Sequence, residues 1–191
     1  NARLNTASAL MELDRYDEAI IVLKDVLGKY ENEMSQRLAY YFYTRLATCY
    51  SEMEEPNYEL AYQYLMTAGK YIQGTDAHDV PVFYLLERGE LLHQLDRHAE
   101  VDEVLAQASE MIPSMSNVNQ LYSNTHFYSL KARSLYKQEQ FEDALANRKV
   151  LHQLMFDRYE KERQDEVDEM RMRFESEQAD VVEQILQEQK A

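Results

Sequence analysis

Few residues in this sequence have the type and spacing that chemistry requires. Glu90 and His93 have the spacing of half of a di-iron site in a helical bundle, but a complete site needs a second such motif and further glutamates. His93 and His98 do not form the His-Glu-x-x-His helix of zinc enzymes. Cys49 is the only cysteine, which excludes an internal disulfide and a multi-thiolate metal site. We therefore expect no metal site and no cofactor. We expect His93 to be a surface or groove histidine with its hydrogen bonds satisfied, and Cys49 to be a small buried hydrophobe.

Signatures of an enzyme are also missing from the sequence. No Gly-rich phosphate loop follows a strand, and the motifs of kinases and hydrolases are absent. An enzyme would need a cleft with several convergent ionisable groups, and only the Glu90 and His93 pair suggests one. We predict that the chain is not an enzyme, has no catalytic residues and works by binding.

Composition predicts an all-α protein and narrows its partners. The 191 residues include only four glycines and three prolines, so few positions stop a helix, and we expect long helices with short connections. The formal charge of −15 argues against nucleic acid and against anionic membrane surfaces as ligands. No apolar run reaches the ~20 residues of a membrane span. The chain starts at Asn1 without a methionine, and we expect any leader, membrane span or output domain to lie outside this sequence.

A helix-turn-helix pattern recurs four times at a spacing of about 40 to 43 residues. Each copy places aromatic and large apolar residues around small ones, at helical spacing. The first copy contains Ala7, Leu10, Tyr16, Ala19 and Leu23; the second contains Tyr43, Leu46, Ala47, Tyr50, Tyr58, Ala61 and Leu65; the third contains Leu85, Gly89, Leu92, Val101 and Leu105; the fourth contains Tyr128, Ala132, Leu135, Phe141 and Ala144. We interpret these residues as core, with Gly89 letting the two helices of its pair approach closely and Ala61 doing the same between repeats.

The repeated pattern resembles the tetratricopeptide repeat, although Val101 stands where alanine is usual. The resemblance implies a right-handed α-α superhelix, a solenoid of about four helix pairs, over residues 1–156. It also implies a concave groove that binds a protein or peptide. The groove positions map onto Tyr41, Thr44, Arg45, Thr48, Phe83, Leu86, Glu90, His93, His126, Ser129, Arg133 and Tyr136.

This set combines aromatic rings with hydrogen-bonding groups, as peptide recognition requires, and Arg45 and Arg133 could each hold a carboxylate. The alternative is that the twelve residues are ordinary inner-face residues without a natural ligand.

The C-terminal segment, residues 157–191, is predicted to continue the last helix, because no glycine or proline follows Phe141. It is highly charged and carries one narrow apolar seam, which fits a short coiled coil and so a possible homodimer. The seam residues are Val167, Met170, Phe174, Val181 and Ile185.

Residues 166–177 resemble the connector that follows tetratricopeptide arrays in Bacteroidetes-type sensor histidine kinases and helix-turn-helix transcriptional regulators, although the usual basic run after it is missing. The resemblance implies a sensory or interaction domain of a bacterial signalling protein. That domain would be periplasmic and attached to the inner membrane only through segments outside this sequence. The alternative is a free-standing cytoplasmic scaffold or adaptor that dimerises through its C-terminal helix.

Overall fold

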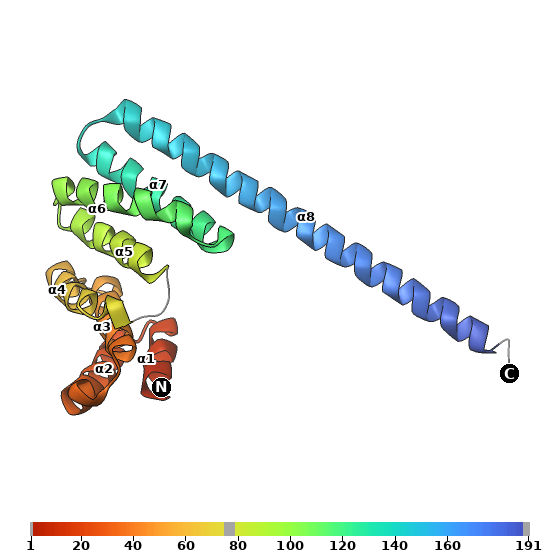
Figure 1. Cartoon of the computed structure of the whole chain (residues 1–191), viewed down its shortest axis with the longest axis horizontal. Coiled ribbons are helices and arrows are strands. Elements are labelled where there is room, and N and C mark those ends of the chain that lie inside the picture. The colour runs from red at the N-terminus through yellow and green to blue at the C-terminus, as the bar shows by residue number, and fades with distance from the viewer. Residues whose placement is uncertain (1, 75–78, 189–191) are drawn as a thin grey trace. The chain divides into compact units, whose positions relative to one another are not determined.

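The computed structural model describes residues 2–74 and 79–188, and every regular element in these ranges is helical. This confirms the predicted all-α class. The eight α-helices of the described ranges are α1 (Ala2–Glu12), α2 (Tyr16–Tyr30), α3 (Gln36–Glu52), α4 (Tyr58–Gly69), α5 (Val80–Gln94), α6 (His98–Met111), α7 (Asn117–Lys137) and α8 (Phe141–Glu188). Short 3-10 turns follow α2, α4 and α6 (Figure 1).

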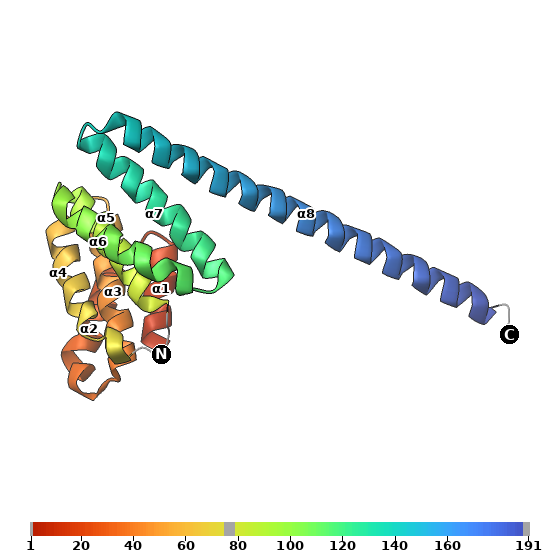
Figure 2. The same ribbon diagram turned by 45° about the horizontal axis from the view of Figure 1, so that its top comes forward.

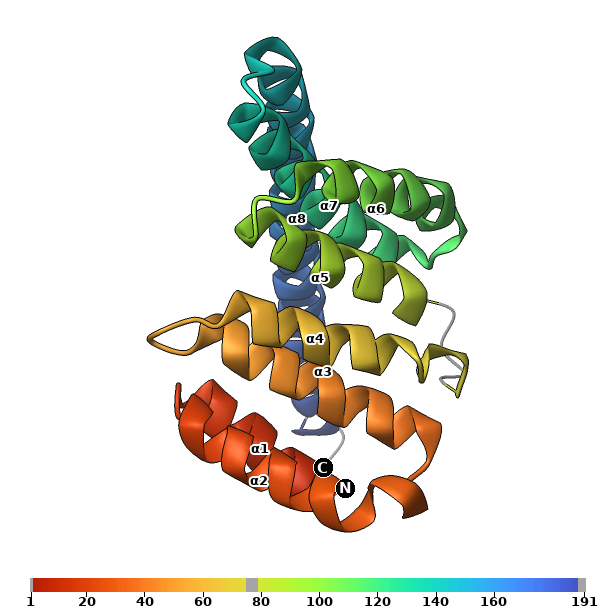
Figure 3. The same cartoon turned by 90° about the vertical axis from the view of Figure 1, so that its left-hand side faces the viewer.

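The helices pack as antiparallel pairs that follow one another in chain order. Helix α1 packs on α2, α3 on α4, and α5 on α6, and each pair then packs on the next through α2 and α3, α4 and α5, and α6 and α7 (Figures 2 and 3). Helices α5 and α7 also contact each other directly. The first helices of neighbouring pairs therefore share one face of the compact part of the chain.

The turn inside a pair has the same geometry in three of the four pairs. Asp14, Asp96 and Glu139 each occupy the left-handed region, with φ of 56°, 56° and 62°. One residue later the backbone N–H donates to a carbonyl five positions back, at 2.9 Å, which is the hydrogen bond of a Schellman helix end. The donors are Arg15, Arg97 and Gln140, and the acceptors are Leu10, Leu92 and Leu135. The pair α3 and α4 differs because the insertion around Pro56 lengthens its turn, and Asn57 caps α4 instead by accepting from the N–H of Leu60 at 3.0 Å.

Gly89 lies at a close contact between helices in the core. A Cβ atom at this position would lie 2.6 Å from Cδ2 of Leu130 on α7 but 3.5 Å from Cγ1 of Val104 on α6. Gly89 therefore contacts the other helix of its pair, as predicted, but its tightest contact is with Leu130, between α5 and α7.

The compact part of the chain covers residues 1–148, and residues 149–191 form a second unit, so the division falls inside α8 and before the predicted boundary at residue 156. Helix α8 has 48 residues, which confirms the predicted long C-terminal helix. Over residues 149–178 the side chains are mostly exposed, and ion pairs one turn apart, such as Glu160 with Arg163 and Glu169 with Arg173, support the helix.

Candidate functional site

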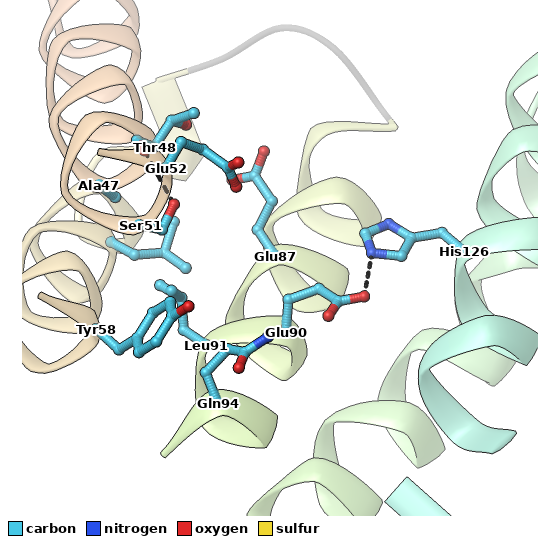
Figure 4. A pocket seen from close by; sticks show the side chains of 11 residues that line it. Ala47, Thr48, Ser51, Glu52, Tyr58, Glu87, Glu90, Leu91, Gln94 and His126 are labelled. Atoms are coloured by element: carbon cyan, nitrogen blue, oxygen red, sulfur yellow. Dashed lines mark hydrogen bonds and ion pairs between the residues drawn. The ribbon is translucent and has the colours of Figure 1, made fainter. Parts of the chain in front are cut away.

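Two neighbouring cavities open on the face that α3, α5 and α7 share. Their volumes are about 480 Å³ and 470 Å³, and Thr48, Glu87 and His126 line both of them. The first is also lined by Ala47, Ser51, Glu52, Tyr58, Leu65, Glu90, Leu91 and Gln94 (Figure 4). The second is also lined by Tyr40, Tyr41, Thr44, Arg45, Asp79, Val80, Phe83, Asn119 and Tyr122. The shared residues make the two cavities one continuous candidate binding surface.

An ion-pair cluster joins α5 to α7 beside the first cavity. Oε1 of Glu90 lies 2.8 Å from Nε2 of His126, as Figure 4 shows, and also accepts a hydrogen bond from Arg133. Burial by itself would raise the pKa of Glu90, but the hydrogen bonds and positive charges of His126 and Arg133 outweigh it and lower that pKa. Glu90 belongs to α5, whereas His126 and Arg133 both belong to α7. The cluster therefore fixes α5 and α7 relative to each other.

The cluster also removes Arg133 from the candidate carboxylate ligands. Its guanidinium already has a carboxylate partner in Glu90. Arg45, in contrast, lines the second cavity, is exposed, and has no ion pair with any residue that the structure describes. Of the two predicted carboxylate-binding arginines, only Arg45 remains available.

Two further carboxylates, Glu52 from α3 and Glu87 from α5, point into the first cavity (Figure 4). The side chain of Glu87 is exposed at the cavity mouth, and the protein around it raises its pKa above the ordinary value, while His126 and Arg45 oppose this rise. A carboxyl group with a raised pKa is stabilised in its charged form by a nearby cation. The first cavity therefore favours a positively charged group.

The second cavity is more aromatic. The rings of Phe83 and Tyr122 meet edge to face with centroids 6.0 Å apart, and Tyr41 lies against Tyr40 in the same way at 5.5 Å. At one end Asn119 donates a hydrogen bond to Asp79, which ties α7 to the start of α5. These rings offer apolar area beside the free charge of Arg45.

A third cavity, of about 570 Å³, lies apart from the first two, toward the C-terminal end of α7. Its lining is His93, Ala132, Arg133, Tyr136, Lys137, Phe141, Ala144, Leu145 and Arg148. It shares no lining residue with the other two.

The twelve predicted groove residues are thus divided among different surroundings. Seven of them line the first two cavities: Tyr41, Thr44, Arg45, Thr48, Phe83, Glu90 and His126. Three line the third cavity instead: His93, Arg133 and Tyr136. Ser129 lines none of the three, and Leu86 is completely buried in the core, which corrects its assignment as a contact residue.

Several site residues were not predicted. Glu87 follows the buried Leu86, and the step of about 100° per residue in an α-helix turns it toward the cavity. It lies one helical turn before Glu90, as Tyr122 does before His126, so the one-turn spacing was a usable signal for both. Glu52, the last residue of α3, lies one turn after the predicted Thr48, so the same spacing could have found it.

Two of the residues first considered for chemistry, His93 and Cys49, are buried in this structure. His93 is 5% exposed, and its Nδ1 has no hydrogen-bond partner among the described residues, so it is not the satisfied surface or groove histidine that was expected. Burial and the nearby Arg133 and Lys137 lower the pKa of His93. Cys49 is fully buried as predicted, and burial raises the pKa of its thiol to about 11. Within the described ranges no three His, Cys, Asp or Glu side chains gather as metal ligands would.

Comparisons with family models, with curated proteins and with solved structures yield no match to this chain. Among the described residues, no helix combines the length and the apolar character that crossing a bilayer requires.

Proposed function

We propose that the chain is a non-catalytic, tetratricopeptide-like domain, a right-handed superhelix of helix pairs, that binds a peptide or an extended protein segment on the face of α3, α5 and α7. The repeated turn geometry at Asp14, Asp96 and Glu139 and the regular packing of successive pairs support the fold assignment. The observation that carries the binding assignment is the pair of open, connected cavities on that face.

The charges of the two cavities specify the ligand further. Glu52 and Glu87 in the first cavity suit a Lys or Arg side chain, whereas Arg45 and the rings of Phe83 and Tyr122 in the second suit an acidic or aromatic residue. The expected ligand is therefore a peptide segment with one basic residue and one aromatic or acidic residue. The two lie a few positions apart, in either order. A chain with a net charge of −15 also attracts basic partners over a distance.

A random peptide library displayed on phage tests this proposal directly. We expect the wild-type protein to enrich peptides with basic residues, and we expect Glu87→Gln and Arg45→Ala each to weaken a selected peptide at least about tenfold in fluorescence anisotropy. Glu103→Gln, an exposed change on α6 away from both cavities, is the matched control and should leave binding unchanged. Equal binding by all four proteins would refute the site.

For the protein as a whole we propose a role as the sensory domain of a bacterial signalling protein, periplasmic and held at the inner membrane through other segments. The similarity of residues 166–177 to the connector of sensor kinases and regulators supports this role. Its test is to read the gene beyond the codon for Ala191: a membrane span followed by a kinase or DNA-binding domain is the expected result.

The alternative is a free-standing adaptor that dimerises through α8. It is favoured by the exposure of Val167, Met170 and Phe174, whereas the side chains of the other two predicted seam residues, Val181 and Ile185, lie outside the part of the chain that the structure describes. A stop codon directly after Ala191 would refute the membrane-held sensory role, and the adaptor would remain as the proposed function.

A further inference from the structure

The cavity between α7 and the first two turns of α8 is an unpartnered apolar surface. Within the first unit, a cavity of about 570 Å³ lies between α7 and the first two turns of α8. Its apolar side chains include Tyr136, Phe141 and Leu145, which are between 56% and 65% exposed. Large exposed apolar residues gathered at one place mark an interaction surface.

No carboxylate lines this cavity among the described residues, whereas Arg133, Lys137 and Arg148 do, in a chain with a net charge of −15. Arg133 and Lys137 have acidic partners in Glu90 and Asp96, but Arg148 forms no ion pair with any residue that the structure describes. The surface therefore suits a partner that presents apolar side chains with carboxylates beside them.

The second unit of this same chain has that chemistry. Val167, Met170 and Phe174 are spaced by three and four residues, which places them on one face of a helix, and they are between 41% and 62% exposed. At 100° per residue, Glu166 and Glu177 lie along one edge of this face. The segment is an acidic amphipathic helix whose apolar face is exposed.

We propose that residues 163–178 of a second copy of this chain occupy the cavity between α7 and α8, and that the contact is reciprocal. Phe174 of one copy then packs against Phe141 of the other, and Met170 against Leu145. When both contacts form along paired α8 helices, the helices run antiparallel, and the same register brings Phe156 opposite Tyr159 near the two-fold axis.

Charge favours the antiparallel arrangement over a parallel one. In a parallel pair Arg148 would face Arg148 of the other copy, whereas the antiparallel register brings Glu166 to the free guanidinium of Arg148. The period of the sequence fits as well: Leu145, Phe156 and Val167 recur at steps of eleven residues, about 3.67 per turn, which predicts one continuous apolar face.

The exposed apolar surface is large enough for a stable dimer. Seven large side chains, each more than two fifths exposed, belong to this face: Phe141, Leu145, Phe156, Tyr159, Val167, Met170 and Phe174. At about 100 Å² of exposed surface each, they offer roughly 700 Å² per chain. A stable interface buries about 800 Å² per partner, which the flanking residues complete.

This inference deepens the adaptor alternative, because antiparallel helices send the two C-terminal ends in opposite directions, which does not suit two chains entering one membrane. It does not depend on peptide binding by the face of α3, α5 and α7. Loss of the dimer with intact peptide binding, or the reverse, separates the failure of one proposal from the failure of the other.

Disulfide trapping tests the register in the full chain with Cys49 replaced by alanine. Leu145→Cys and Met170→Cys each sit at an exposed position, so folding should be retained, as far-UV circular dichroism will show. We expect a covalent dimer when the two variants are mixed and none from either variant alone. Cross-linking of Leu145→Cys with itself would overturn the proposal in favour of a parallel pair, and the absence of any cross-link together with a monomeric mass in light scattering would overturn it altogether.

A matched pair of charge substitutions provides a second measurement. Phe174→Glu should raise the dissociation constant of the dimer at least about tenfold in sedimentation velocity. Met172→Glu is the control, since Met172 is equally exposed, at 63%, but lies on the opposite face of the helix. Equal effects of the two variants would contradict the proposed contact.

Discussion

The close contact between Gly89 and Leu130 allows one prediction to be worked out in energy. Replacing a helical glycine by alanine stabilises a protein by about 0.5–1 kcal/mol, because alanine loses less backbone entropy on folding. At position 89, however, the new methyl group would lie 2.6 Å from Cδ2 of Leu130, which is fully buried and cannot swing into solvent. Overpacking of this kind costs about 1–3 kcal/mol. Gly89→Ala should therefore destabilise the fold, by about 0.5–2 kcal/mol after both effects are combined.

Gly28→Ala is the matched control, since nothing lies within 4 Å of a Cβ atom at that position in α2. It should stabilise the protein by about 0.5–1 kcal/mol. Urea unfolding followed by circular dichroism measures both changes, and their difference isolates the steric cost. If the two substitutions stabilise the protein equally, α5 and α7 are not packed as closely as Gly89 indicates.

Two further predictions concern single residues. Glu139 has a φ of 62°, a conformation that costs a residue with a side chain about 1–2 kcal/mol. Glu139→Gly should therefore raise the free energy of unfolding by about 1 kcal/mol, measured by urea unfolding. A loss of stability would contradict the left-handed turn. The lowered pKa of Glu90 means that its ionised form stabilises the fold above the ordinary value of 4.5, and that this contribution disappears as the pH falls through the lowered pKa. Glu90→Gln should accordingly cost about 1–3 kcal/mol at pH 7, because the charged hydrogen bonds to His126 and Arg133 are lost, and much less once the wild-type carboxylate is protonated. A cost that does not change with pH in thermal unfolding would rule out this ion-pair cluster.

Part of the candidate site was predictable because groove positions recur with the helical period. The tetratricopeptide resemblance assigned Arg45, Thr48 and His126 to the groove, and all three line the first two cavities. Leu86, in contrast, is buried, and the next residue, Glu87, lines the cavity instead. A rotation of 100° about the helix axis separates the two side chains. How far each helix is rotated depends on what it packs against, and a repeat pattern contains that information only on average.

The helical class, the paired helices and the length of α8 could be predicted from the sequence, because they follow from local properties: apolar residues at helical spacing, and the rarity of glycine and proline. The contacts between distant side chains, in contrast, depend on how the helices pack. Glu90 pairs with His126 and Arg133, which are 36 and 43 residues away, rather than with the neighbouring His93. The packing of Leu130 over Gly89 also joins α5 to α7, and so fixes the distance across which that ion-pair cluster forms. Contacts of this kind depend on the summed packing of many buried side chains, which no local spacing in the sequence specifies.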